Sequence, residues 1–383
     1  MKVGVIGAGA MGAGIAQVAA VAGHEVLLYD TAPAALEKAR QNLEKTLQKL
    51  QEKGKLVSAA DVLGRIRLAG TLPDLKDCGL VIEAIIESLD IKQKVFAALE
   101  AQVSPGCVLA TNTSSLSVTS IAAACKAPER VLGLHFFNPA PLMALVEVIP
   151  ALQTRAGLAA EMTALMQQWG KIPVLAKDTP GFIVNRVARP FYGEAIRIFE
   201  EGIASPATID WAMTTLGSFR MGPFTLMDYI GHDVNYVVTE TVWKSFFYDP
   251  RYKPSFSQKR LLEAGWLGRK TGRGFYDYSE GTALPQPIPD EALGRHLVDR
   301  IGAMLMNEAI DALHLGVASA ADLELAMTKG VNYPKGLLQW ADEAGAMRVL
   351  AVLDALYEEY GEDRYRASVL LRRKAKEEGR FLS

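Results

Sequence analysis

The feature that most constrains the fold is a glycine-rich turn between a short apolar strand and an apolar helix. Residues 2–6 are a β-branched run typical of a strand buried on both faces, and Gly7-Ala8-Gly9-Ala10-Met11-Gly12 follows with the spacing G-x-G-x-x-G. Gly7 permits a tight turn, Gly9 lets backbone N–H groups approach a pyrophosphate, and Gly12 lets helix and strand pack closely. The helix dipole then faces the phosphates. The motif predicts that Gly7, Gly9, Met11 and Gly12 line a dinucleotide site.

An acidic residue at the end of the next predicted strand indicates which dinucleotide binds. Residues 25–30 form a strand-like run that ends in Asp30, 18 residues after Gly12. A carboxylate at this place accepts hydrogen bonds from both ribose hydroxyls and repels a 2′-phosphate, so NAD is favoured over NADP. Because strand, helix, second strand and acid occur in order, an ordinary glycine-rich turn explains the motif poorly.

Strand-like and helical segments alternate through the first half of the chain. The alternation predicts an α/β fold with a mostly parallel, doubly wound sheet of the Rossmann type, whose ligand binds beyond the carboxyl ends of the strands. Further strands are expected at 65–68, 80–84, 108–111, 131–135 and 145–149, and the clearest helices at 33–53 and 91–103.

Three polar groups lie near the ends of these predicted strands. Residues 111–115, Thr-Asn-Thr-Ser-Ser, form either a turn that caps a helix or part of a site. His135 has apolar neighbours, and a histidine in such company is more often a core residue. Glu147 lies inside an apolar strand, where an unpaired carboxylate would cost several kcal/mol. We therefore expect Glu147 to pair with one imidazole nitrogen of His135 and leave the other nitrogen available to take a proton.

The composition excludes several classes of protein. The 41 basic and 43 acidic residues give a net charge of −2, which offers no basic surface to nucleic acid or an anionic membrane. The three cysteines have no C-x-x-C spacing, so we expect neither a disulfide framework nor a metal site, and a reducing, cytoplasmic setting. The uncharged run 3–23 is too rich in glycine for a membrane span or a signal peptide.

The second half of the chain has a helical pattern and an internal repeat. Pro180 fits the first turn of a long helix that extends to Glu201. Residues 194–231 return as 308–345 at a constant offset of 114, with 13 of 38 positions identical. The repeat predicts two all-α helical domains related by duplication. We expect domains at 1–178, 179–283 and 284–383, with the proline-rich segment 285–289 as a stiff linker between the last two.

The motifs together resemble the L-3-hydroxyacyl-CoA dehydrogenase family. The resemblance extends from residue 1 to about 280, with the motifs in the order in which the family has them. It rests on Gly-Ala-Gly-Ala-Met-Gly (7–12), Asn-Thr-Ser-Ser-Leu (112–116), His-Phe-Phe-Asn-Pro (135–139), Leu-Val-Glu-Val-Ile (145–149), Lys-Asp-Thr-Pro-Gly-Phe-Ile-Val-Asn-Arg (177–186), Met-Gly-Pro-Phe (221–224) and Gly-Arg-Lys-Thr-Gly-Arg-Gly-Phe-Tyr (268–276).

The resemblance implies an NAD-dependent, reversible oxidation of L-3-hydroxyacyl-CoA to 3-oxoacyl-CoA, on short or medium acyl chains or on a dicarboxyl variant. It makes His135 the catalytic base, Glu147 its partner, Ser114 the residue that binds the 3-hydroxyl and Asn185 a contact of the acyl thioester. Two further sets match the family's NAD-binding and coenzyme A-binding positions. They are Asp30, Glu87, Lys92, Asn112, Asn138 and Lys270 for NAD, and Thr46 and Lys53 for coenzyme A.

Two alternative functions and one question of assembly accompany this interpretation. A dehydrogenase of a free 3-hydroxy acid would resemble enzymes built around a catalytic lysine, and a non-catalytic NAD-binding protein would be expected to lack His135 or Glu147. In short family members the single helical domain pairs with that of another subunit in a homodimer. Here the second repeat has Asp299 in place of Asn185 and no equivalent of Lys270, so we expect it to be structural and to replace part of that contact.

Overall fold

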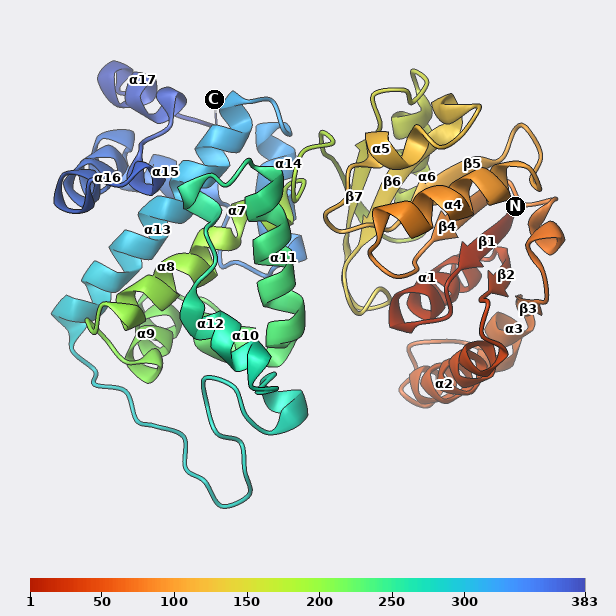
Figure 1. Cartoon of the computed structure of the whole chain (residues 1–383), viewed down its shortest axis with the longest axis horizontal. Helices are drawn as coiled ribbons and strands as arrows, with labels where there is room; N and C mark the ends of the chain where they lie inside the picture. Colours follow the sequence, from red (N-terminus) through yellow and green to blue (C-terminus); the bar gives the residue numbers. More distant parts are fainter. Residues whose placement is uncertain (383) are drawn as a thin grey trace. The chain divides into compact units, whose positions relative to one another are not determined.

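The computed structural model describes residues 1–382, and the chain divides into two compact units, Met1–Phe182 and Ile183–Ser383 (Figure 1). The first unit is a sheet with helices on both faces, and the second is largely helical. Among the described residues, no helix combines the length and the apolar character that crossing a membrane requires.

An eight-stranded sheet forms the centre of the first unit. Its strands are β1 (Lys2–Ile6), β2 (Glu25–Tyr29), β3 (Ile66–Ala69), β4 (Leu80–Glu83), β5 (Val108–Thr111), β6 (Val131–Phe136), β7 (Leu145–Pro150) and β8 (Ile172–Leu175). They lie in the order β3-β2-β1-β4-β5-β6-β7-β8, and every neighbouring pair is parallel except β6 and β7. The predicted mostly parallel, doubly wound sheet is confirmed. Strand β8 was not predicted, because its four residues include a proline.

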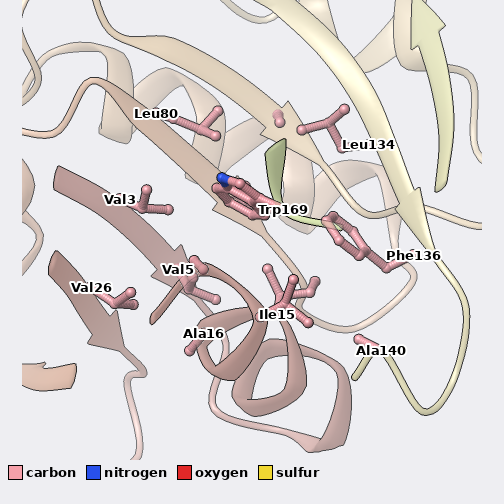
Figure 2. Close-up of a cluster of buried hydrophobic side chains, with 14 of the residues drawn as sticks. Val3, Val5, Ile15, Ala16, Val26, Leu80, Leu134, Phe136, Ala140 and Trp169 are labelled. Carbon is pink, nitrogen blue, oxygen red and sulfur yellow. The ribbon is translucent and has the colours of Figure 1, made fainter. Parts of the chain in front are cut away.

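Helices cover both faces of this sheet. They are α1 (Ala10–Val21), α2 (Pro33–Glu52), α3 (Ala59–Gly64), α4 (Leu89–Glu100), α5 (Val118–Ala122) and α6 (Leu158–Gln168), with short 3-10 turns η1 (Leu72–Leu75) and η2 (Pro128–Arg130). Apolar residues of α1, α2, α3 and α6 form one buried cluster with the strands. Figure 2 shows Ile15 of α1 in this cluster with Val5, Leu134 and Phe136 of the sheet. The cluster fixes α1 against the strands whose ends carry the candidate site.

The turn between β1 and α1 requires glycine at two positions. Gly7 has φ 102°, and a Cβ there would lie 2.5 Å from the backbone oxygen of Ala84. A Cβ on Gly12 would lie 1.8 Å from the carbonyl oxygen of Gly7. Gly9 caps α1, and a Cβ on Gly9 would meet nothing within 4 Å. The chain therefore packs tightly around the turn but leaves room at the N-terminus of α1.

The second unit consists of helices that differ greatly in length. Figure 1 shows the longest of them, α13 (Glu291–His314), running alongside α8 (Arg189–Glu200). The others are α7 (Val184–Val187), α9 (Pro206–Trp211), α10 (Pro223–Ile230), α11 (His232–Ser245), α12 (Phe256–Glu263), α14 (Ala320–Leu325), α15 (Leu337–Ala344), α16 (Ala346–Tyr360) and α17 (Val369–Glu377). Between them lie the π-helical segments η3 (Ala212–Leu216) and η6 (Ala326–Gly330) and the 3-10 turns η4 (Pro250–Tyr252), η5 (Arg269–Thr271) and η7 (Asp363–Tyr365).

The helix predicted to begin at Pro180 begins later and is interrupted. Gly181 and Phe182 have positive φ angles of 73° and 48°, and the Phe182 N–H donates to the carbonyl of Thr179 in a turn. Helical structure therefore starts at α7, and Pro190 lies in the first turn of the separate helix α8. The predicted start at Pro180 was wrong because a left-handed turn intervenes.

Candidate active site

His135 and Glu147 form a buried pair between the two antiparallel strands of the sheet. They lie directly opposite each other in the register of β6 and β7, and Nδ1 of His135 lies 2.6 Å from Oε2 of Glu147. His135 is 5% exposed and Glu147 is fully buried. This confirms the predicted contact. A carboxylate at Nδ1 fixes the tautomer and orientation of the ring and stabilises the imidazolium that forms when the other nitrogen takes a proton.

Two aromatic rings lie beside this imidazole. The rings of Phe137 and Phe182 have centroids 4.4 Å and 5.9 Å from that of His135. Nothing in the described part of the chain hydrogen-bonds to Nε2 of His135. The pair therefore has one nitrogen engaged and one available for an incoming hydroxyl group.

Ser114 belongs to a hydrogen-bonded turn organised by Glu87. One oxygen of Glu87 accepts from the Ser114 N–H at 2.9 Å, from its hydroxyl at 3.2 Å and from the Thr113 hydroxyl at 2.6 Å. Burial raises the pKa of Glu87, but the charge of Lys92 and these hydrogen bonds outweigh it, so the pKa lies below its ordinary value. Glu87 is thus held as a carboxylate that positions the Ser114 turn at the end of β5.

Lys92 has a second, fully buried partner in Glu83. Its Nζ lies 2.6 Å from Glu83 and 3.3 Å from Glu87. Glu83 also accepts from the hydroxyl of Thr111 at 2.7 Å, which ties the end of β4 to the end of β5. Sequence reasoning missed Glu83, although a carboxylate ending the apolar run Leu-Val-Ile-Glu gives the same signal that identified Glu147. The ion pair connects two of the predicted NAD-site residues through one network.

Asn112 and Asn138 lie just beyond the ends of the neighbouring strands β5 and β6. The side-chain oxygen of Asn112 accepts from the Phe136 N–H at 2.8 Å, next to His135 in the chain. Asn138 is exposed just beyond β6, and the loop after it is held by Lys171, whose Nζ donates to the carbonyls of Ala140 and Met143. Burial lowers the pKa of Lys171 to about 8. Both asparagines thus lie at the strand edge where a dinucleotide is expected.

A cavity of about 600 Å³ lies at the glycine-rich turn. Its lining includes Gly7, Gly9, Met11 and Asp30, with apolar side chains from the β4–α4 region. Asp30 accepts from the backbone N–H groups of Ala8 at 2.7 Å and Ala32 at 2.9 Å, so its carboxylate is fixed at the cavity wall. These residues fit an adenosine diphosphate group, because the cavity offers a helix N-terminus, a carboxylate and an apolar wall.

Replacing Asp30 by alanine is expected to lower the preference for NAD over NADP by at least about 10-fold. The change removes the hydroxyl acceptor and the repulsion of a 2′-phosphate. Ratios of kcat/KM with the two cofactors measure the effect, and Asp61→Ala, an exposed acid on α3, is the matched control. An unchanged ratio in the Asp30 variant would contradict the assigned ribose contact.

Asn185 and Lys270 belong to the second unit. Asn185 lies in α7, and Lys270 lies in η5 with its Nζ 2.5 Å from Asp233. The loop that carries Lys270 is anchored by buried Asp228, which accepts from the backbone N–H groups of Phe275 and Tyr276, both at 2.9 Å. Sequence reasoning did not single out Asp228. The roles of Asn185 and Lys270 toward substrate and NAD stay predictions.

The remaining predicted residues, Thr46 and Lys53, lie on the exposed face of α2 and at its C-cap. Both side chains are accessible to a large anionic ligand, and their contact with coenzyme A stays a prediction. Within residues 1–382, no cluster of three or more His, Cys, Asp or Glu side chains is arranged to hold a metal ion.

Models of one protein family match both halves of the chain. The model described as "3-hydroxyacyl-CoA dehydrogenase, NAD binding domain" matches residues 2–179. The model described as "3-hydroxyacyl-CoA dehydrogenase, C-terminal domain" matches residues 181–278 and again residues 296–381. The matches together cover nearly the whole sequence.

Individual relatives agree with these models. The chain is 39% identical to the 3-hydroxyadipyl-CoA dehydrogenase of Escherichia coli K12, over 97% of each protein. It is 45% identical to a probable 3-hydroxybutyryl-CoA dehydrogenase of Deinococcus radiodurans, over 73% of this chain and 100% of the relative. A crystal structure of an Escherichia coli 3-hydroxybutyryl-CoA dehydrogenase superimposes with a TM-score of 0.93 at 38% identity, over 99% of this chain and 98% of the other.

Proposed function

The chain belongs to the 3-hydroxyacyl-CoA dehydrogenase family and is thus an NAD-dependent oxidoreductase that acts on a CH–OH group, and from this premise we propose that it converts L-3-hydroxyacyl-CoA reversibly to 3-oxoacyl-CoA. The observation that supports the chemical step best is the 2.6 Å contact between His135 and buried Glu147. A non-catalytic NAD-binding protein would have no use for this pair, whose burial is costly without a function.

His135 acts as the general base. Its Nε2 takes the proton of the 3-hydroxyl group, while Glu147 holds Nδ1 and stabilises the resulting imidazolium. NAD, when bound, supplies the hydride acceptor for C3 of the substrate. In the reverse direction the same imidazolium returns its proton to the oxygen of the 3-oxo group. Phe137 and Phe182 beside the ring help exclude water from the proton transfer.

Polar residues near the base orient the substrate. The Ser114 hydroxyl, placed by Glu87, hydrogen-bonds the 3-hydroxyl, and Asn185 contacts the acyl thioester. Glu87, Lys92, Asn112, Asn138 and Lys270 hold the nicotinamide end of NAD. Thr46 on the exposed face of α2 and Lys53 at its C-cap receive coenzyme A. These assignments rest on the matched motifs and on the network that connects Ser114, Glu87 and Lys92.

A direct comparison of thioester and free acid tests the proposed substrate class. The kcat/KM for oxidation of NADH by acetoacetyl-CoA should exceed that for free acetoacetate by at least about 100-fold. The reason is that binding of the coenzyme A moiety, remote from the reacting carbon, helps to stabilise the transition state. Equal rates with the two compounds would remove coenzyme A from the account and favour a dehydrogenase of free 3-hydroxy acids.

We propose that the substrate range includes a dicarboxyl acyl chain. The Escherichia coli relative that matches 97% of this chain is named a 3-hydroxyadipyl-CoA dehydrogenase. The Escherichia coli crystal structure that covers 99% of this chain, and the shorter Deinococcus relative, are named for 3-hydroxybutyryl-CoA. A rate profile over CoA esters of increasing length, with one dicarboxyl ester of matched length, distinguishes a range that includes dicarboxyl chains from one limited to short monocarboxyl chains. Activity confined to four-carbon esters would contradict this part of the proposal.

We also propose that residues 179–283 and 284–383 are a duplicated helical domain, called here the first and second repeat, which follows an NAD-binding domain at 1–178. The double match of one C-terminal model supports this. So do the π-helical segments η3 and η6, which are offset by 114 residues, and Gly231 and Gly345, whose φ angles are 99° and 84°. These features recur at matched positions, as expected for two copies of one fold.

A pair of reciprocal ion pairs supports the further proposal that the two repeats cover each other. Arg186 of the first repeat donates to Glu308 of the second at 2.7 Å, and Arg300 of the second donates to Glu194 of the first at 2.6 Å. Arg300 is the counterpart of Arg186, and Glu308 is the counterpart of Glu194, each at an offset of 114 residues. Each repeat therefore gives the same arginine to the same glutamate of the other repeat, as at a two-fold interface. We infer that the second repeat replaces the helical contact that single-repeat members of the family make between subunits.

A further inference from the structure

A carboxamide side chain bridges two backbone groups in the second repeat. Asn307, on α13, donates from its Nδ2 to the carbonyl of Arg366 at 3.1 Å and accepts at its Oδ1 from the Ser368 N–H at 2.7 Å. The side chain is 2% exposed. One planar amide thus satisfies a donor and an acceptor that lie two residues apart, before α17.

The first repeat has the same backbone groups but no such side chain. The counterpart of Asn307, at an offset of 114, is Gly193 on α8. The counterparts of Arg366 and Ser368 are Lys253 and Ser255, before α12; their offset is 113, and both segments have the pattern Arg-Tyr-x-x-Ser. Lys253 has φ −56° and ψ 122°, and Arg366 has φ −58° and ψ 118°, so the two segments share one backbone conformation. Among residues 1–382, nothing donates to the Lys253 carbonyl or accepts from the Ser255 N–H.

These groups line a groove of about 330 Å³ in the first repeat. Its walls include Gly193, Lys253 and Ser255, together with the aromatic side chains of Tyr236, Trp243 and Phe256. A Cβ added to Gly193 would meet nothing within 4 Å, so the glycine opens the groove without being needed for packing. A glycine within a helix costs about 1 kcal/mol relative to alanine. The groove thus presents the Lys253 carbonyl and the Ser255 N–H, a pair that one carboxamide group can bridge, beside an aromatic wall.

We propose that this groove binds a small aromatic primary carboxamide. The ligand amide donates to the Lys253 carbonyl and accepts from the Ser255 N–H, as the Asn307 side chain does in the second repeat. Its ring packs against Trp243 and Phe256. An acid of the same shape lacks the N–H donor, so the Lys253 carbonyl selects the amide. The site lies wholly in the first repeat and does not depend on the proposed dehydrogenase chemistry.

A pair of substitutions at one position tests the geometry. Gly193→Asn should place its own carboxamide on Lys253 and Ser255, whereas Gly193→Ala adds only a Cβ into open space. Asparagine is the poorer helix former, so without the bridging contact the asparagine variant would melt below the alanine variant. We expect it to melt above by about 2–4 °C. A lower melting temperature for Gly193→Asn would overturn the proposal.

Binding of defined probes tests the ligand class. Ligand-observed NMR with benzamide and nicotinamide, on enzyme saturated with NADH so that the dinucleotide site is filled, should show binding with Kd of about 1 mM. Benzoate and nicotinate should bind at least about 10-fold more weakly. Gly193→Ala should retain the amide binding and Gly193→Asn should lose it, while turnover of acetoacetyl-CoA stays unchanged in both. Absence of amide binding to the wild-type chain, or its survival in Gly193→Asn, would contradict the assignment.

Discussion

Replacing His135 by glutamine is expected to lower kcat by about 10²–10⁴ and to leave the affinity for NADH almost unchanged. The glutamine amide can still donate to Glu147, so the buried carboxylate keeps a partner and the strands keep their register. What the variant loses is the nitrogen that we propose as the acceptor of the 3-hydroxyl proton. Steady-state kinetics with acetoacetyl-CoA and fluorescence titration with NADH separate the two quantities.

The exposed histidine of α13 provides the control for this experiment. His296→Gln makes the same chemical change far from β6 in the sequence and should leave kcat within about 2-fold of the wild-type value. Turnover of His135→Gln within a few-fold of wild type would show that another group is the base. A large loss of NADH affinity would instead indicate that the substitution disturbs the dinucleotide site.

Replacing Glu308 by glutamine should lower the free energy of unfolding of the second unit by about 3–5 kcal/mol. Glu308 is 2% exposed and accepts from Nε of Arg186 and from the hydroxyl of Tyr252, with Arg251 at 3.7 Å. Glutamine keeps the shape but removes the one fully buried negative charge of this cluster. Arg186 then keeps only the partly exposed carboxylate of Asp311, which it shares with Arg251. Chemical denaturation followed by tryptophan fluorescence measures the change.

Two further variants make the stability prediction specific. Glu343→Gln removes the exposed partner of Lys335 and should cost no more than about 1 kcal/mol. Glu194→Gln removes the reciprocal carboxylate and should cost about as much as Glu308→Gln. Light scattering should also show that no dimer of the wild-type chain is held through the first repeat alone. Such a dimer, or a loss below about 1 kcal/mol in Glu308→Gln, would contradict mutual covering by the repeats.

Patterns along the chain predicted the sheet and the central pair because each depends on local chemistry. Gly7 and Gly12 have no room for a Cβ, and Glu147 requires a partner wherever its strand is buried. His135 was the predicted partner of Glu147 because both residues belong to strands that were expected in the same sheet. The register of β6 and β7 places His135, rather than another cation, opposite Glu147.

Other features depend on contacts that no local pattern contains. The apolar run before Glu83 indicates that this carboxylate needs a partner, but it does not identify the partner as Lys92, nine residues away on α4. The interruption after Pro180 arises from the left-handed conformation of Phe182, which residues other than glycine rarely adopt. The proposed amide contacts in the groove at Gly193 can be inferred only from the structure of the second repeat, in which Asn307 bridges Arg366 and Ser368. Sequence periodicity places these residues on elements but does not determine their partners.

The most direct test of the account follows the hydride itself. Acetoacetyl-CoA should be reduced with NADH deuterated at C4 of the nicotinamide, on the face from which the hydride is transferred, and the product examined by NMR and by chiral analysis after hydrolysis of the thioester. The account predicts L-3-hydroxybutyryl-CoA with one deuterium at C3, formed by the wild-type chain and at least about 10²-fold more slowly by His135→Gln. A product without deuterium at C3 when either face of the cofactor is labelled, or one of D configuration, would contradict it.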